Sequence, residues 1–566
     1  MSKVVATGAQ FFDTIRANDS FYVDKTGFIQ EWWDNQDDVT LITRPRRFGK
    51  TLNMSMMNCF FSDRYAGRSD LFEGLQVWED QRFHDLQGRF PVLFISFAGV
   101  KQASFDLARK SINQIIANLY NSYTEIFLDP WFTEMDARFI SQIASDMPDD
   151  VAAVSLQKLC ELLYRYYGKK VLIFLDEYDT PLQEAYIHGY WNELVSFVRA
   201  LFNNTFKTNP SLGRAILTGI TRVSKESIFS DMNNLEVITT TSEKYATCFG
   251  FTEQEVFQAL EDQGCGEAEK QAVKTWYDGF TFGSVTDIYN PWSVTNYLDK
   301  RLLETYWANT SENALVNNLI RQGNARLKTQ FETLLEGGAL TLPLDEQVIF
   351  EQLHQRENAI WSLLLAAGYL KVLSVDRQRD LNPKKKNLYT LTLTNQEVQI
   401  MFDDMVQGWF EEGQYFNEFV AAMFRGNELD MNRYMNRIAL KTFSYFDAGE
   451  KPGESEPERF YHGFVLGLLV DQAEGYELTS NRESGFGRYD VVMTPKRHSD
   501  PAVIMEFKVI DPELGEKSLE ETAQNALKQI EEKKYDTELL AKGIAKDNIL
   551  KYGFAFKGKE CLIRKG

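Results

Sequence analysis

The sequence predicts an α/β protein: a parallel sheet with helices on both faces, then a helical region, then a smaller α/β domain. Four short apolar runs in the first half indicate the sheet, at residues 39–42, 91–97, 171–175 and 215–218. Because these runs lack polar alternation, each suits a strand that is buried on both sides. Segments with helical spacing of apolar residues separate them, and strands that alternate with helices are typical of parallel sheets.

The composition indicates a folded chain and limits its partners. The 566 residues are 44% apolar and 25% charged, which excludes bulk disorder and a collagen-like repeat. This length corresponds to about three or four domains. The chain has 61 basic and 81 acidic residues, a net charge of −20. That charge argues against polyanion binding over the whole surface, but it leaves room for a local basic groove.

The cysteines and the apolar stretches predict a cytoplasmic protein. Five scattered cysteines form no Cys-x-x-Cys pair, so a disulfide framework and a zinc site are not expected. Residues 1–20 show no secretory signal. The longest apolar stretches, 359–370 and 463–470, are shorter than the roughly 20 residues that span a bilayer, so no membrane contact is expected.

The chain becomes more helical beyond about residue 252. Short helices are expected at 253–260 and 268–277, and an alternating strand at 388–393. The polar stretch 448–458 is the best linker candidate. The expected domains are a sheet domain at 1–240, a helical lid at 241–330, a mostly helical connecting region at 331–450, and a second α/β domain at 451–566.

A candidate phosphate-binding loop lies between the first strand and the helix that follows it. Gly49-Lys50-Thr51 precedes a helical stretch from Leu52. In such a loop the lysine reaches phosphate oxygens, and the threonine hydroxyl binds Mg²⁺. The first position of the usual pattern is Arg44 instead of glycine. On these residues alone, an accidental Gly-Lys-Thr is an equal alternative.

Acidic residues follow the third apolar run. Asp176 at the end of a buried strand can hold Mg²⁺ through water, and Glu177 can polarise the attacking water. The alternative is that these acids cap the next helix, and the phosphate-loop candidate upstream favours the metal site. Asp179 is interpreted as a cap or turn residue.

The fourth apolar run also ends in polar residues. Thr218 is placed to sense a γ-phosphate, and Arg222 to act on phosphate in its own subunit or a neighbouring one. For Arg222 the favoured alternative is an ordinary surface arginine.

Six motifs, taken together, carry a family resemblance. They stand at residues 21–26, 44–52, 176–181, 218–222, 276–280 and 289–293. Together they resemble the AAA-ATPase-like family of bacterial proteins, over roughly residues 5–300. The resemblance implies a P-loop NTPase sheet with a helical lid, with ATP and Mg²⁺ as ligands, and makes Arg44 a family trait. The nucleotide-binding residues would be Arg46, Arg47, Phe48, Gly49, Lys50, Thr51 and Asp176.

The C-terminal region contains a second set of acidic and basic residues. In the expected strand 502–509, Glu506 and Lys508 share one face. A second strand at 487–493 carries Asp490, and pairing of the two would bring Asp490 beside Glu506. Two carboxylates can hold Mg²⁺ or Mn²⁺, and a lysine can orient water. The alternative is a solvated Glu-x-Lys ion pair.

Auxiliary residues are expected on the flanking helices. Glu458 could add a metal ligand, and His462 either contacts phosphate or packs on a helix face. Gln529 and Lys533 are four residues apart, so they share one face of a helix and could contact substrate, with Tyr535 near its end.

Four segments of the C-terminal region resemble the PD-(D/E)XK nuclease superfamily. They are Glu458–Phe464, Gly487–Asp490, Ile504–Lys508 and Ala526–Ile530. The resemblance implies a restriction-endonuclease-like domain with Asp490, Glu506 and Lys508 as the catalytic core. Tyr489 stands where the proline of the superfamily's name would be.

The leading hypothesis is therefore an ATPase fused to a metal-dependent nuclease, with ATP controlling the cleavage of nucleic acid and DNA favoured over RNA. The alternative is an ATP-switched regulator that binds nucleic acid or protein without cutting. A homo-oligomer is left open.

Overall fold

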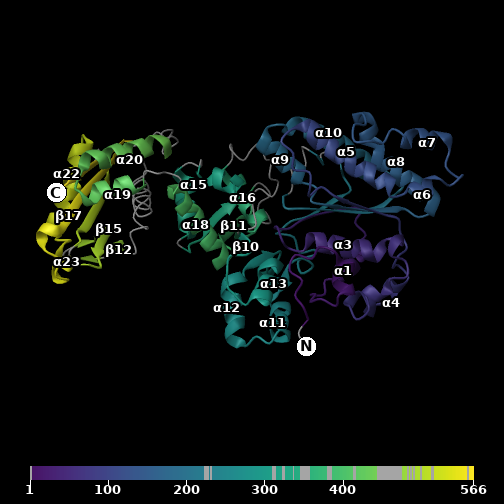
Figure 1. Cartoon of the computed structure of the whole chain (residues 1–566), viewed down its shortest axis with the longest axis horizontal. Helices are drawn as coiled ribbons and strands as arrows, with labels where there is room; N and C mark the ends of the chain where they lie inside the picture. Colours follow the sequence, from purple (N-terminus) through teal and green to yellow (C-terminus); the bar gives the residue numbers. More distant parts are fainter. Residues whose placement is uncertain are drawn as a thin grey trace. The chain divides into compact units, whose positions relative to one another are not determined.

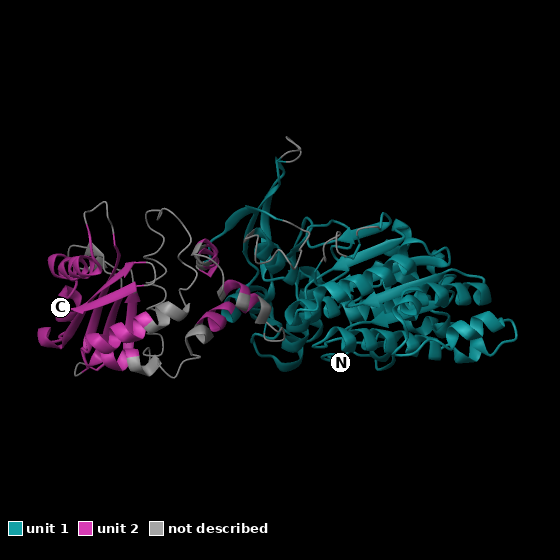
Figure 2. Ribbon diagram, turned by 90° about the horizontal axis from the view of Figure 1, so that it is seen from above, with its two compact units in different colours: residues 1–313, 337–401 teal, residues 314–336, 402–566 magenta. Residues whose placement is uncertain are grey.

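The computed structural model divides the chain into two compact units, residues 1–313 with 337–401, and residues 314–336 with 402–566 (Figure 2). Each unit is described by itself. The structure describes residues 3–221, 228–229, 232–308, 314–321, 325–335, 337–344, 357–378, 385–411, 416–442, 475–480, 483–484, 487–488, 491–497, 500–510, 516–557 and 560–566.

A five-stranded parallel sheet forms the centre of the first unit. Its strands are β1 (Val39–Thr43), β2 (Val92–Ser96), β3 (Val171–Asp176), β4 (Leu212–Gly219) and β5 (Leu235–Ile238), in the order β2-β3-β4-β1-β5. Every residue of β1 and β3 is buried, as their uninterrupted apolar sequences predict. The predicted parallel sheet is thus confirmed, although β5 was not predicted. Its sequence Leu-Glu-Val-Ile is short and half-buried, so it lacks the apolar signature of its neighbours.

Helices cover both faces of this sheet. In Figure 1, α5, α8 and α10 lie on one side of it, and α1 and α3 lie on the other. The core on the α1 and α3 side includes Phe12, Met54, Phe61 and Phe174. The bounds are α1 (Phe12–Ala17), α3 (Lys50–Phe61), α5 (Phe105–Asn121), α8 (Asp149–Tyr167) and α10 (Trp191–Phe202).

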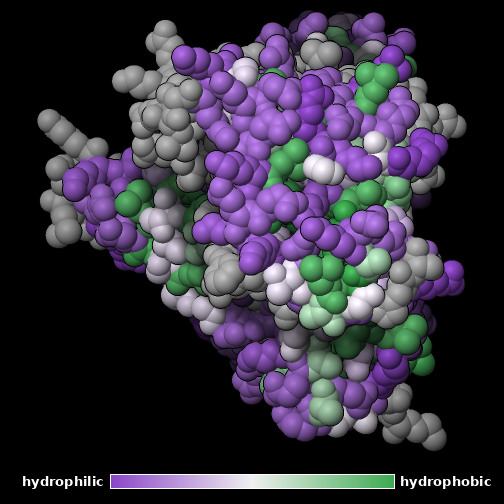
Figure 3. Space-filling view, turned by 90° about the vertical axis from the view of Figure 1, so that its left-hand side faces the viewer, coloured by the Kyte–Doolittle hydropathy of each residue, from purple (hydrophilic) through white to green (hydrophobic). Residues whose placement is uncertain are grey.

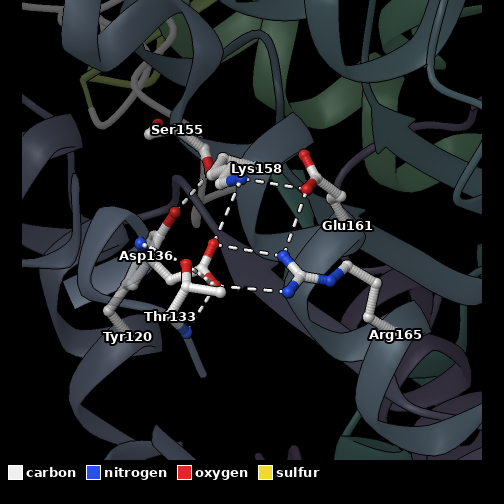
Figure 4. A network of polar contacts seen from close by, with 7 residues as sticks. All are labelled: Tyr120, Thr133, Asp136, Ser155, Lys158, Glu161 and Arg165. Atoms are coloured by element: carbon white, nitrogen blue, oxygen red, sulfur yellow. Dashed lines mark hydrogen bonds and ion pairs between the residues drawn. The ribbon is translucent and has the colours of Figure 1, made fainter. Parts of the chain in front are cut away.

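A buried carboxylate fixes the short helix α7 (Glu134–Ile140) against α8. Asp136 is only 2% exposed. Figure 4 shows Lys158 and Arg165 of α8 pointing at its carboxylate, at 3.4 and 3.1 Å between nitrogen and oxygen. Thr133 also donates its backbone and hydroxyl hydrogens to this carboxylate. Burial alone would raise the pKa of Asp136, but the hydrogen bonds from Thr133 and Arg165 hold that pKa well below its usual range.

The segment 251–300, within the expected helical lid and called the lid below, combines helices with a small sheet. Its helices are α11 (Glu253–Asp262), α12 (Glu267–Tyr277) and α13 (Pro291–Lys300). The first two confirm the expected helices. The antiparallel sheet β6-β8-β7, with β6 (Phe251–Thr252), β7 (Phe280–Phe282) and β8 (Val285–Tyr289), was not predicted. Strands of two to five residues are too short for an alternating pattern to stand out.

The connecting region contributes to both units. In the first unit it forms α16 (Glu357–Ala367) and a three-stranded antiparallel sheet, β10-β11-β9, of β9 (Leu340–Pro343), β10 (Leu370–Asp376) and β11 (Leu388–Leu393). The strand β11 has the bounds expected from its alternation. Helix α18 (Gln396–Glu411) begins in the first unit and continues past residue 401 into the second.

The second unit is built on a mixed sheet of order β12-β15-β16-β17-β18. Strands β16 and β17 are parallel, and the other neighbours are antiparallel. The core on one face includes Phe419 and Met431, and the core on the other includes Leu527 and Ile530. The elements are α14 (Ala314–Arg321), α15 (Ala325–Leu335), α19 (Phe416–Phe424), α20 (Glu428–Thr442), β12 (Tyr476–Ser480), β15 (Val491–Pro495), β16 (Ala502–Val509), α22 (Leu519–Glu532), α23 (Thr537–Ala541), β17 (Ile549–Lys557) and β18 (Glu560–Lys565).

The surface matches the composition. Most of the face seen in Figure 3 is hydrophilic, and its apolar side chains form small separate patches, as expected for a chain with a net charge of −20. Within the described residues, no helix combines the length and the apolar character needed to cross a membrane.

We expect Asp136→Asn to lower the free energy of unfolding by about 1–3 kcal/mol, because an amide cannot replace the carboxylate that accepts from Thr133 and Arg165. Since the pKa of Asp136 is lowered by folding, its contribution is present above the unfolded value of 3.8 and is lost as the pH falls below it. Scanning calorimetry of both proteins, at about pH 7 and in steps toward about pH 3, measures the difference.

The matched control is Glu161→Gln. Glu161 contacts the same two cations but is 45% exposed, so its loss should cost less than about 0.5 kcal/mol. Equal losses in the two variants would contradict the assigned role of Asp136.

Candidate nucleotide site and candidate nuclease site

The candidate phosphate loop connects β1 to α3. It leaves the sheet after Thr43 and enters the helix at Lys50. Gly49 has φ of 77°, and a β-carbon there would meet nothing within 4 Å. Glycine is therefore favoured at this position because the backbone is left-handed, and not because another group approaches closely. Arg47 also has a positive φ, of 63°.

Lys50 lies inside this loop. Its side chain is buried, and its ammonium donates to the backbone oxygens of Arg44 at 3.0 Å and Pro45 at 2.8 Å. Burial lowers the pKa of Lys50, while nearby Glu177 opposes that shift. The cation is therefore held in place by loop carbonyls, which phosphate oxygens can replace as acceptors.

The loop, β3 and β4 converge on Asp176. This residue is fully buried at the end of β3. Its carboxylate accepts from the hydroxyl of Thr51 at 2.7 Å and from that of Thr218 at 2.6 Å. Burial raises the pKa of Asp176, although both hydroxyls oppose the shift. The strand order explains why Thr51, Asp176 and Thr218 come together, because β4 lies between β1 and β3. Carboxylate and hydroxyl oxygens are hard ligands, so this set fits Mg²⁺.

Two further acids follow Asp176. Glu177 has φ of 51° and accepts from the Thr180 hydroxyl at 3.2 Å. Asp179 was interpreted as a cap or turn residue, and it does precede α9 (Thr180–His188). Its carboxylate, however, accepts from the backbone N–H groups of Ile220 at 3.0 Å and Thr221 at 2.9 Å. The Asp179 side chain makes no capping hydrogen bond to α9; it holds the loop after β4, a role that its sequence neighbours do not indicate.

Arg44 has a structural role that explains the missing glycine. It is fully buried, and its guanidinium donates to the backbone oxygens of Thr239 at 2.7 Å and Tyr245 at 3.3 Å. The guanidinium carbon also lies 4.4 Å from the ring centroid of Phe282. Burial lowers the pKa of Arg44 to about 10. The residue thus ties the start of the loop to the segment after β5 and to the lid.

The remaining loop residues face the lid. The Arg47 guanidinium carbon lies 4.4 Å from the ring centroid of Trp292 on α13. The Phe48 ring is 1% exposed and packs on Phe280, with ring centroids 4.7 Å apart. The backbone oxygen of Arg46 accepts from the side chain of Asn290 at 3.3 Å. We therefore place the Phe48 ring in the lid contact, where it orients the loop.

A cavity of about 530 Å³ lies over this loop, within the range of small-molecule sites. All the predicted loop residues line it, and Glu177 does as well. Lys101, Gln183 and Trp292 also line it, and the sequence had not marked Lys101 or Gln183. The predicted members of the lining are Arg46, Arg47, Phe48, Gly49, Lys50, Thr51 and Glu177.

The candidate nuclease site centres on Glu506 in β16. Glu506 is 3% exposed. Its carboxylate accepts a hydrogen bond from the Gln529 amide on α22, which also donates to the Tyr535 hydroxyl at 3.1 Å. The predicted alternation is confirmed, because Met505 and Phe507 belong to the core on the opposite face. Gln529, on α22, therefore lies beside Glu506, the predicted site residue on β16.

The other residues predicted for this site differ in placement. Lys508 is half-buried in β16, two residues beyond Glu506. Lys533 is exposed at the end of α22. Asp490, Glu458 and His462 lie outside the described residues, as does Arg222, which was predicted for the nucleotide site.

The expected strand at 487–493 is corrected. The structure has two strands there, β14 (Gly487–Arg488) and β15. The first pairs with β13 (Glu483–Ser484) in a separate sheet, while β15 pairs with β16. In that pairing Val491, which follows Asp490 in the chain, lies opposite Met505, which precedes Glu506. Val492 belongs to the core on the α22 side, together with Ile504.

Comparison with known proteins finds a family match for each of the two domains. A family model described as predicted AAA-ATPase matches residues 6–229, and a model of the PD-(D/E)XK nuclease superfamily matches residues 456–566. The chain is also 25% identical over 553 residues to a protein of Azotobacter chroococcum mcd 1 described as "Uncharacterized protein in vnfD 5'region". The match covers 96% of this chain and 94% of that protein. Both resemblances seen in the motifs are thus confirmed: the chain carries an AAA-ATPase-like domain followed by a domain of the PD-(D/E)XK nuclease superfamily.

Proposed function

We propose that this protein hydrolyses ATP in its N-terminal domain and cleaves nucleic-acid phosphodiester bonds in its C-terminal domain, with the nucleotide state controlling cleavage. The observation that carries the proposal is the convergence of Thr51 and Thr218 on the buried Asp176, beside a loop that holds Lys50 under a cavity of nucleotide size. In a chain that also buries Glu506 in a nuclease-superfamily domain, this pairing favours an ATP-controlled nuclease.

In the ATPase domain each residue has a distinct role. The Lys50 ammonium exchanges its two carbonyl partners for phosphate oxygens and offsets their charge. Thr51 and Asp176 would hold Mg²⁺, which neutralises charge on the phosphates when bound. Glu177 orients and polarises the attacking water. Thr218 fixes the orientation of Asp176 and is proposed to sense the γ-phosphate, and Arg222 is proposed as a further phosphate contact.

In the nuclease domain, Asp490 and Glu506 would hold Mg²⁺ or Mn²⁺. Such an ion, when bound, lowers the pKa of its water and offsets charge on the phosphate being cleaved. Lys508 orients the water or stabilises developing charge, while Gln529 positions the Glu506 carboxylate. Glu458, His462 and Lys533 are proposed as auxiliary groups, either at the metal or at substrate phosphates.

The substrate is proposed to be nucleic acid, with DNA favoured over RNA, and the site of action the cytoplasm. The five cysteines are buried and unpaired with one another, which supports a reducing compartment. Arg222 is proposed to act on phosphate in its own subunit or, in a homo-oligomer, in a neighbouring one.

We expect Lys50→Ala to lower ATP turnover at least about 100-fold, because the buried cation that faces the phosphates is lost. Phosphate release by the full chain, with Mg²⁺ and ATP, measures this. Thr51→Ser keeps the hydroxyl that Asp176 accepts from and should stay within about threefold of wild type. Turnover that survives in Lys50→Ala would reject the nucleotide site.

We expect Glu506→Gln to lower metal-dependent cleavage at least about 100-fold, because an amide is a poor ligand in place of the carboxylate. Asp490→Ala should have the same effect. Single-stranded DNA, duplex DNA and RNA are each incubated with Mg²⁺ or Mn²⁺, with and without ATP.

The matched control is Glu532→Gln, because Glu532 is 62% exposed on the adjacent α22 and should leave cleavage unchanged. Cleavage that persists in Asp490→Ala would overturn the nuclease assignment. No cleavage in wild type, with ATP turnover intact, would favour a switched binding protein instead.

A further inference from the structure

Trp307, which follows α13 in the chain, contacts the backbone of the phosphate loop. The backbone oxygen of Arg46 accepts from the Trp307 indole N–H at 3.0 Å, besides the bond from Asn290. Trp307 is 1% exposed and lies 261 residues from Arg46 in sequence. Its ring packs against Phe280 and Tyr369, with ring centroids 5.4 and 5.6 Å away. The Arg46 carbonyl is therefore held by this indole together with Asn290.

Trp307 is in turn fixed by a buried carboxylate at the start of α18. Glu397 is fully buried. Its carboxylate accepts from the backbone N–H groups of Trp307 at 2.6 Å and Ala308 at 3.4 Å, and from the Ser293 hydroxyl at 2.8 Å. One side chain thus joins α18, the segment around Trp307, and the first turns of α13.

Burial of this carboxyl is costly without such partners. Burial raises the pKa of Glu397 to about 7, although the hydrogen bonds from Ser293 and Trp307 oppose the rise. An apolar side chain would avoid that cost but would leave the Trp307 and Ala308 N–H groups without this acceptor. The carboxylate is therefore suited to fixing one arrangement of these three segments.

A second contact links the same region to the loop. Gly368 has φ of 91°, and a β-carbon there would lie 2.8 Å from the Pro45 ring. The backbone oxygen of Gly368 accepts from the Thr394 hydroxyl at 2.7 Å, two residues before α18 begins. Residues 45 and 46 of the loop therefore both contact groups that are tied to the start of α18.

Helix α18 is shared by the two compact units. Glu397 is in its first turn, within the first unit, and the helix runs on to Glu411, within the unit that holds the nuclease-superfamily domain. A shift of the helix start is transmitted along a continuous hydrogen-bonded helix.

We propose that Glu397 is a positioning residue that couples the phosphate loop to α18 through Trp307, so that the connecting region reports the nucleotide state to the rest of the chain. This inference rests on the proposed ATP control of cleavage and names the contacts that would carry it. Nucleotide binding that displaces the Arg46 carbonyl alters its bond to Trp307, and with it the bonds of Trp307 and Ala308 to Glu397. The coupling thus has a defined chain of two hydrogen-bonded links.

The test follows α18 directly by hydrogen–deuterium exchange of the full chain, with and without saturating ATP and Mg²⁺. In wild type we expect ATP to change the exchange rate of the α18 amides by about tenfold, within the usual range of coupling between sites. Glu397→Ala should abolish that change. Glu397→Gln should restore it, because the amide oxygen still accepts from Trp307 and the amide nitrogen can donate to Ser293.

Trp307→Phe is a second, milder variant, because it keeps an aromatic ring and removes the N–H that reaches Arg46. It should also uncouple α18 from ATP. The control is Thr341→Ala on β9, whose hydroxyl pairs with Thr390, and which should keep the full response. A response to ATP that is equal in wild type, Glu397→Ala and Trp307→Phe would overturn the inference.

Two parallel measurements separate this inference from the proposed function. Equilibrium ATP binding is measured for each protein, with Lys50→Ala as the negative control, and cleavage is measured beside Glu506→Gln. Absence of ATP binding to wild type would reject the proposed function and the inference with it. ATP binding with no change in α18 exchange would overturn the inference alone, whatever the cleavage result.

Discussion

The buried carboxylate of Asp176 is the interaction on which the AAA-ATPase-like domain depends. It accepts hydrogen bonds from Thr51, at the start of α3, and from Thr218, at the end of β4. A buried acid is costly unless it is hydrogen-bonded, so the sheet edge is stable only when the loop, β3 and β4 are all in place. The same requirement brings a hydroxyl and a carboxylate together beside Lys50, which is the arrangement that a magnesium nucleotide needs.

In the second unit the buried carboxylate of Glu506 likewise needs a hydrogen-bond donor. Glu506 is 3% exposed in the middle of β16, so its hydrogen-bond donor must come from a neighbouring element. Gln529 on α22 is that donor. The close approach of α22 requires Gly553 on β17, where a β-carbon would overlap the Ala523 backbone oxygen. The small residue Gly553 on β17 thus allows α22 to pack closely enough for Gln529 to orient Glu506 on the neighbouring strand β16.

The sequence predicted what depends on local pattern. Apolar runs predicted β1 to β4, and alternation predicted β11 and the two faces of β16. Motif spacing brought Lys50, Thr51 and Asp176 to one site because strand ends meet at one edge of a parallel sheet. It did not predict β5 or the lid sheet, whose strands are too short or too exposed to leave a pattern. The contact of Asp179 with the loop after β4 and that of Trp307 with Arg46 also escaped it, because both depend on partners more than 40 residues away.

The bond from Trp307 to the Arg46 carbonyl has a consequence for synthesis. The loop acquires this partner only after 261 further residues have been made, and Trp307 is fixed only once Glu397 has followed. Contacts of such long sequence separation carry a large loop-closure entropy and slow folding. The whole set nevertheless precedes residues 456–566, which match the nuclease superfamily. On the ribosome, where domains fold from the N-terminus onward, the nucleotide loop can therefore be complete before the first residue of the nuclease domain is made.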